Sequence, residues 1–314
     1  MNMNKKNENN FVISAEVERA LTNHQPLVAL ETAVVTHGLP HPDNLSLARK
    51  MESVVRDEGS VPATVGVVKG TVYVGLSADQ LEYLANETDL MKISHRDFAP
   101  AAAFGKSGGT TVAGSIIAAH LAGISVFATG GIGGVHRGNA FDVSTDLIEL
   151  SRRPVIVVCA GAKAILDLPA TIEYLETMGV PVVGYQTDEF PAFYSRKSGL
   201  PVSARADTPE EVVRIARAHW GLGLQSAILV VVPPPHETAL EAGYVERAVS
   251  KALAEVKAKG IRGQAVTPYL LSRVSQITKK ESLATNIDLL LNNGRVAARI
   301  AAAFTHLAEK TYRI

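Results

Sequence analysis

The sequence predicts an α/β fold: a layered α/β/α arrangement around a largely parallel or mixed central sheet, with glycine-rich loops at the carboxyl ends of its strands. Short runs of Val, Ile, Leu and Ala recur along the chain, as is typical of strands covered on both faces. Longer amphipathic stretches separate these runs, and this alternation favours helices packed on a mainly parallel sheet.

The strands are predicted from apolar runs that end in small or polar residues. In chain order, the runs are "PLVAL" ending at Leu30, "ATVGVV" around Val65, "TVYVGL" around Val72, "SVFATG" ending at Gly130, "VIVVCAG" ending at Gly161, "PVVGYQ" around Val183 and "AILVVVPPP" ending at Pro235.

The helices are predicted from periodic apolar positions between these runs. Ser77 is a suitable N-cap before one of them, and Gly260 follows a lysine-rich last turn in another. The predicted helices cover residues 44–58, 77–85, 110–122, 144–150, 162–178, 237–259 and 286–309.

The amino-acid composition limits the domain organisation and the kinds of partner that the chain can have. With 314 residues, 46% of them hydrophobic, the chain can form a single α/β domain over 15–314, with two subdomains as the alternative. Residues 1–14 are predicted to form a polar, flexible tail. The net charge of zero gives no general attraction to nucleic acid or to a membrane. Cys159, the single cysteine, excludes an intrachain disulfide and suggests the cytoplasm.

Polar residues follow several of the predicted strands. Glu31 follows the first, the loop Thr129–Gly138 with His136 and Arg137 follows another, and Lys163 comes after "VIVVCAGA". Ligands of open α/β sheets bind beyond the carboxyl ends of the strands. We therefore expect these residues to share a site.

The loop Thr129–Gly138 is rich in glycine. Its four glycines would let backbone amides approach an anion, and His136 and Arg137 add positive character. Neither Gly-Lys-Ser/Thr nor a complete Gly-x-Gly-x-x-Gly pattern is present. The loop therefore disfavours a dinucleotide or a nucleoside triphosphate, and leaves a smaller phosphate ester open.

The segment "NAFDVSTDLIEL" has two interpretations. Ser144 can cap a helix whose first turn carries Asp146. Alternatively, Asp142 and Asp146 can bind a hard cation such as magnesium or manganese, with water or substrate completing the shell. Zinc is disfavoured because its usual ligands are missing.

Lys92 and Lys163 also have two interpretations. Lys92 can lie on an edge strand before a charged turn, and Lys163 can be a solvated charge at a helix start. Alternatively, Lys163 forms a Schiff base, which requires that burial or a neighbouring cation favours the uncharged amine. Glu31 at a neighbouring strand end would then transfer protons.

Longer motifs go beyond this general chemistry. In chain order they are "ALETAVVTHGLPHPDN", "GSVPATVGVVKGTVYVGLS", "KISHRDF", "GGTTVAG", "FATGGIGGVHRG", "FDVSTDL", "VVCAGAKAILDLPATIEYLETMGVPVVGYQTDEFPAFY" and "TPYLL". Through these motifs the chain resembles, from about Val17 to Ala303, the pseudouridine-5'-phosphate glycosidase family, which includes indigoidine synthase A-like proteins.

The resemblance implies reversible cleavage of pseudouridine 5'-phosphate to uracil and ribose 5-phosphate. It implies that Lys163 forms a Schiff base with ring-opened ribose and that Glu31 donates protons. It also implies one Mn²⁺ per subunit on Asp142, a homotrimer and a cytoplasmic location. The implied substrate-binding and supporting residues are Lys92, Val112, Thr129, His136, Ser144, Thr145, Asp146 and Asn286.

Two departures from the family pattern bear on the metal. Only Asn139 and Ala140 separate "HRG" from "FD", and Gln264 stands where a charged residue is more usual. Two other functions stay open: an aldolase-like lyase that uses Lys163 on a sugar phosphate, and an inactive homologue that only binds phosphosugars.

Overall fold

The computed structural model describes residues 10–261 and 263–311. In this part of the chain one mixed, mainly parallel sheet has the strand order β1-β4-β3-β2-β7-β10-β14-β12-β13, with β5 and β6 beside β3. β4 and β6 pair antiparallel with β3, and β1 and β5 run in the same direction as β4 and β6. The strands are β1 (Phe11–Ile13), β2 (Leu27–Leu30), β3 (Val61–Val68), β4 (Thr71–Val74), β5 (Met91–Ile93), β6 (Gly108–Thr110), β7 (Val126–Ala128), β10 (Ile156–Cys159), β12 (Val182–Tyr185), β13 (Ala204–Ala206) and β14 (Ile228–Val231).

A small second sheet lies beside the carboxyl ends of the central strands. It consists of β8 (Val135–His136), β9 (Asn139–Val143) and β11 (Leu166–Asp167), in the order β11-β8-β9. Both pairings are antiparallel. This sheet joins the glycine-rich loop to the segment that carries Lys163.

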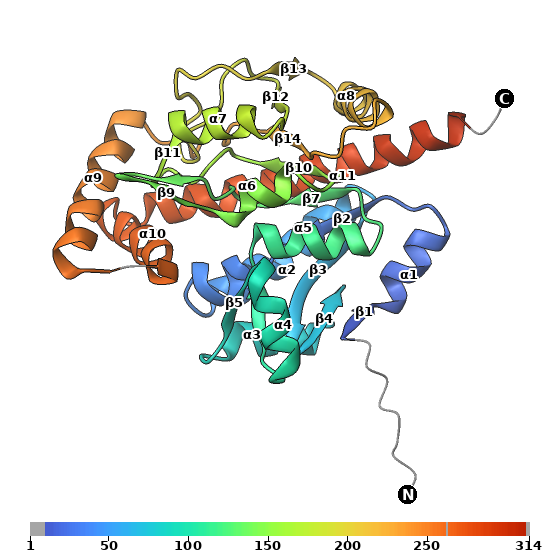
Figure 1. Cartoon of the computed structure of the whole chain (residues 1–314), viewed down its shortest axis with the longest axis horizontal. Helices are drawn as coiled ribbons and strands as arrows, with labels where there is room; N and C mark the ends of the chain where they lie inside the picture. Colours follow the sequence, from blue (N-terminus) through green and yellow to red (C-terminus); the bar gives the residue numbers. More distant parts are fainter. Residues whose placement is uncertain (1–9, 262, 312–314) are drawn as a thin grey trace, which may run out of the picture.

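Helices cover the central sheet, so the predicted layered α/β fold is confirmed (Figure 1). On one face, the long α11 packs against α2 and α8 and against β2, β7 and β10; α5 lies against β2, β3 and β7. The helices are α1 (Ala15–Thr22), α2 (Asp43–Asp57), α3 (Ala78–Asn86), α4 (Phe98–Ala103), α5 (Val112–Leu121), α6 (Thr145–Leu150), α7 (Leu168–Thr177), α8 (Pro209–Gly221), α9 (Ala242–Lys259), α10 (Val266–Ile277) and α11 (Glu281–Thr311), with short turns η1 (Val34–Gly38), η2 (His95–Asp97) and η3 (Gly263–Ala265).

The predicted helix signals are confirmed where capping groups act locally. The Ser77 hydroxyl accepts a hydrogen bond from the Gln80 amide at 3.2 Å and begins α3. Gly260, with φ of 64°, ends α9 in the left-handed conformation that glycine favours. Ser144 caps α6 by accepting from the Asp146 amide at 3.2 Å.

Two sequence predictions are corrected. Residues 11–13 are not part of a tail, because β1 pairs with β4 and continues the sheet; residues 1–9 lie outside the described residues. The helix expected over 162–178 begins only at Leu168, because Asp167 caps it and Pro169 occupies its first turn. Lys163 therefore lies in a loop and not at the positive end of a helix.

No helix in the described part of the chain combines the length and the apolar character needed to cross a bilayer.

Candidate active site

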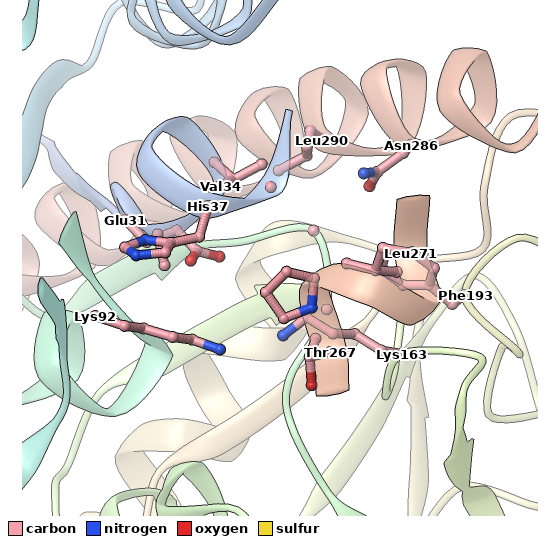
Figure 2. A pocket seen from close by; sticks show the side chains of 15 residues that line it. Glu31, Val34, His37, Lys92, Lys163, Phe193, Thr267, Leu271, Asn286 and Leu290 are labelled. Atoms are coloured by element: carbon pink, nitrogen blue, oxygen red, sulfur yellow. The ribbon is translucent and has the colours of Figure 1, made fainter. Parts of the chain in front are cut away.

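The carboxyl ends of β2, β7 and β10 bring the predicted residues together. These strands are parallel neighbours, so Glu31, Thr129 and Lys163 leave the sheet at one edge. Glu31, Lys92, Lys163 and Asn286 line a single pocket there (Figure 2). Its atom-free volume is about 560 Å³ when the open solvent at its mouth is included.

The remaining wall of this pocket comes from several parts of the chain. The short π-helical turn η1 contributes Val34 and His37, the loop after β12 contributes Phe193, and the C-terminal helices complete the wall (Figure 2). The further lining residues are Ala33, Gly38, Gly130, Gly131, Thr267, Pro268, Leu271 and Leu290.

Glu31 is the acidic group of the pocket. The hydroxyl of the buried Thr129 donates a hydrogen bond to Glu31 Oε1. Burial raises the pKa of the Glu31 carboxyl, and the nearby Lys163 and the Thr129 hydrogen bond only partly oppose this. A carboxyl with a raised pKa holds its proton closer to neutral pH, as a general acid must.

Two amines, Lys92 and Lys163, enter the pocket from different elements (Figure 2). Burial lowers the pKa of Lys92 on β5, and the charge of Lys163 lowers it further. Burial also lowers the pKa of His37, with Lys92 acting in the same direction. The pocket therefore combines two amines and an imidazole with one buried carboxyl.

The loop that carries Lys163 is fixed by backbone and guanidinium contacts. The Lys163 amide donates to the Ile132 carbonyl at 3.1 Å. The Arg137 guanidinium donates to the Ala164 carbonyl at 3.1 Å and also pairs with Glu246 on α9. Arg137, which the sequence suggested as part of an anion site, therefore supports the Lys163 loop instead.

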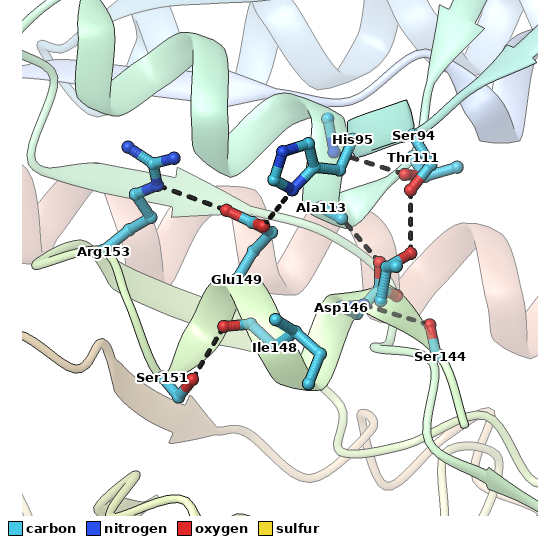
Figure 3. Close-up of polar contacts among 12 residues, drawn as sticks. Ser94, His95, Thr111, Ala113, Ser144, Asp146, Ile148, Glu149, Ser151 and Arg153 are labelled. Carbon is cyan, nitrogen blue, oxygen red and sulfur yellow. Dashed lines mark hydrogen bonds and ion pairs between the residues drawn. The ribbon is translucent and has the colours of Figure 1, made fainter. Parts of the chain in front are cut away.

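Asp146 holds the glycine-rich loop against α5 (Figure 3). Its Oδ2 accepts from the Gly133 amide at 2.7 Å, and its Oδ1 accepts from the Ala113 amide at 2.8 Å in the first turn of α5. A side chain on Gly133 would collide with Ser144, which lies 2.2 Å from the position of the Cβ atom. The Gly133 amide, expected to face a bound anion, thus serves a carboxylate of the protein, and so does the Ala113 amide.

We expect Asp146→Ala to lower the free energy of unfolding by about 2–5 kcal/mol, because the buried Ala113 amide and the partly buried Gly133 amide lose a charged acceptor. Asp146→Asn keeps one acceptor oxygen and should lose less. Urea denaturation of the three proteins tests this. An alanine variant as stable as the wild type would show that the carboxylate does not hold the loop.

The other predicted binding residues lie around the pocket without lining it. Val112 begins α5 with its side chain in the core, so only its backbone could reach a ligand. Thr145 is exposed, and its hydroxyl lies 2.8 Å from that of Ser94, two residues after Lys92. His136, on β8, feels the charges of Lys92 and Lys163, but burial is the main cause of its lowered pKa.

Asp142 is the predicted metal ligand. It is exposed on β9, and its Oδ2 lies 4.0 Å from His136 Nδ1. Within residues 10–261 and 263–311, no three His, Cys, Asp or Glu side chains gather as a metal site would require. These donors fit a largely hydrated hard cation on one carboxylate and do not fit a closed protein cage.

The comparisons with known proteins show the family of this chain. The family model described as "Indigoidine synthase A like protein" matches residues 16–303. The chain belongs to this family. Curated members similar to it are a pseudouridine-5'-phosphate glycosidase of Herpetosiphon aurantiacus, 53% identical over 93% of this chain and 97% of the relative, and one of Caldanaerobacter subterraneus, 48% identical over 96% and 99%.

Two solved structures of this family's type have the same fold. The prealnumycin C-glycosynthase AlnA, in complex with ribulose 5-phosphate, has a TM-score of 0.88 and 39% identity over 96% of this chain and 98% of its own. An indigoidine synthase A-like protein of Thermotoga maritima has a TM-score of 0.88 and 34% identity over 97% and 100%.

The sequence prediction missed several residues that line the pocket, among them His37, Phe193 and Leu290. His37 stands soon after a strand end, so its position was a usable signal. Leu290 lies four residues after the predicted Asn286, which places both on one face of α11. Phe193 carried no such signal, because only the fold of the loop after β12 brings its ring to Gly131.

Proposed function

We propose that this protein is a pseudouridine-5'-phosphate glycosidase, which cleaves the carbon–carbon glycosidic bond of its substrate reversibly to give uracil and ribose 5-phosphate. The observation that carries the proposal is a pocket amine, Lys163, beside a buried carboxyl, Glu31, whose pKa is raised. The names of the curated relatives, about half identical over nearly the full chain, support the substrate.

The bond to be broken explains why an amine is needed. An ordinary glycosidase protonates the oxygen of its leaving group, but uracil leaves through carbon and offers no such lone pair there. An amine attached to C1' can push electrons toward the leaving carbon and form a C=N bond. Lys163, which lines the pocket from the loop after β10, would supply this amine.

In the proposed reaction, Lys163 Nζ attacks C1' and forms a C–N bond, while the C1'–O4' bond breaks and O4' takes a proton. The C1'–C5 bond then breaks; its electron pair stays on uracil C5, which is protonated, and C1' becomes an iminium carbon. Water adds to this carbon, and ribose 5-phosphate leaves as the free aldehyde. The sum is hydrolysis and needs no oxidant.

Glu31 moves the protons in this scheme. Its buried position raises its pKa, so it can carry the proton that C5 receives and can later deprotonate the attacking water. Lys92 would supply positive charge for the phosphate end from β5, where its charge also acts on His136. Thr145, which contacts Ser94, and Ser144 are further substrate-binding residues that the family resemblance implies. Asn286 contributes an amide to the pocket wall.

The manganese ion is a further part of the proposal. Asp142 would hold it with a single carboxylate, and water would complete its shell. A hard cation there supplies positive charge that orders water and substrate. The homotrimer and the cytoplasmic location likewise rest on the resemblance and stay predictions.

Incubation of the purified protein with pseudouridine 5'-phosphate and Mn²⁺ is expected to release uracil, detected by chromatography, together with an equal amount of ribose 5-phosphate. Incubation of these two products should form pseudouridine 5'-phosphate. Aldol cleavage of sugar phosphates without uracil release would favour the lyase, and ligand binding without turnover would favour an inactive homologue. Either result would overturn the proposal.

A further inference from the structure

We propose that Asn293 is a positioning residue for the proton-transferring carboxyl Glu31, acting through the backbone of Thr129. This inference rests on the proposed function. Asn293 lies on α11, and its side chain does not line the pocket. It is completely buried, as is Thr129.

The contacts run from α11 to the end of β7. Asn293 Nδ2 donates to the Thr129 carbonyl at 2.9 Å and to the Gly130 carbonyl at 3.4 Å, although Thr129 is 164 residues away in sequence. On the same residue, the Thr129 hydroxyl donates to Glu31 Oε1. The Asn293 amide group therefore fixes the backbone of Thr129, and the Thr129 hydroxyl in turn holds the Glu31 carboxyl.

The chemistry of the amide explains why this position needs asparagine. Both neighbouring groups are carbonyls and can only accept, so the NH₂ end must face them. Its Oδ1 is then buried, and it has no hydrogen-bond partner among the described residues. An unpaired buried oxygen disfavours folding. We infer that the asparagine serves the site and not the stability of the protein.

The helix geometry supports the same role. Asn286, Leu290 and Asn293 are spaced so that they share one face of α11, and the first two line the pocket. A Cβ atom on Gly130 would lie 3.2 Å from Leu290, so α11 packs closely on the backbone just after Thr129. Asn293 extends this contact between α11 and the loop to Thr129, the residue that follows β7.

The charged groups that act on Glu31 come from other elements. They are Lys163 from the loop after β10, Lys92 from β5 and Asp146 from α6, while His37 shares the pocket. The three residues on this face of α11 carry no charge. An effect of Asn293 on the titration of Glu31 must therefore pass through the hydrogen bond from Thr129, which favours the ionised carboxyl.

The test is the pH profile of uracil release by the full-length Asn293→Leu variant. We expect kcat to fall by about 10- to 100-fold with little change in KM. The limb of the profile that disappears in Glu31→Gln should move to higher pH, since the ionised carboxyl loses its donor. Asn292→Leu, the same change at the next position of α11, is the matched control and should keep the wild-type profile.

Two more variants make the outcome decisive. Thr129→Val removes the hydroxyl directly and should shift the same limb; combined with Asn293→Leu, it should shift the limb no further. Asn293→Ser keeps a donor and should recover part of the rate, and it replaces the leucine variant if that protein does not fold. A lower rate without a shifted limb, or an unchanged Asn293→Leu enzyme, would overturn the inference. Absence of uracil release by the wild type would instead refute the proposed function.

Discussion

Lys163→Ala is expected to abolish release of uracil from pseudouridine 5'-phosphate, with kcat lowered by roughly 10⁴-fold or more, because the covalent route through C1' is lost. The fold should remain, since the Lys163 side chain projects into a pocket, and only its backbone holds the loop. Steady-state assays over a range of substrate concentrations measure the effect on kcat and KM separately.

Chemical trapping identifies the amine directly. Reduction with borohydride in the presence of ribose 5-phosphate should add the mass of the reduced sugar phosphate to the peptide that contains Lys163. Lys92→Ala is the matched control, because it removes the other pocket amine and should leave the adduct on Lys163. An adduct on Lys92, or full activity in Lys163→Ala, would contradict the proposed mechanism.

Glu31→Gln should lower kcat by about 10²- to 10⁴-fold, the usual contribution of a positioned acid or base. Glutamine keeps the size of the side chain and an oxygen that can accept from Thr129. Binding of ribose 5-phosphate should therefore change little, which calorimetry can verify. An active Glu31→Gln enzyme would assign the proton transfer to another group.

The same substitution should change the pH dependence of stability. Burial raises the pKa of Glu31 above its ordinary value of 4.5, so the folded protein binds the proton more tightly than the unfolded chain. This contribution to the free energy of unfolding is fully present below the ordinary pKa and is lost as pH rises through the raised pKa. The Glu31→Gln protein has no ionisable group at this position, so it does not lose stability in this way as the pH rises.

We therefore expect Glu31→Gln to gain stability over the wild type as the pH increases. Urea denaturation at about pH 4 and about pH 8 compares the two proteins on both sides of the transition. A stability difference that is the same at both values would mean that the folded state does not perturb the carboxyl.

The sequence by itself determined the alternation of strands and helices, because the apolar runs and the caps at Ser77, Ser144 and Gly260 act locally. It also placed Glu31, Thr129 and Lys163 after neighbouring strands. The strand considered around Lys92 is confirmed as β5, but the short strand β6 carried no clear pattern, since pairing across the sheet creates it. The same holds for β1, whose edge pairing with β4 shortened the expected tail.

Only the tertiary structure decided what these residues contact. Asp146 and Arg137 were candidates for a ligand site, yet they bind backbone groups of the protein, because loops that leave the sheet need internal partners for buried polar atoms. The role of Asn293 could not be predicted from local sequence pattern, because its hydrogen-bond partner Thr129 is 164 residues away in the chain. A local sequence pattern can place a functional side chain at the end of a strand. Contacts between segments that are distant in sequence determine how that side chain is held. These contacts depend on tertiary packing, which no single segment encodes.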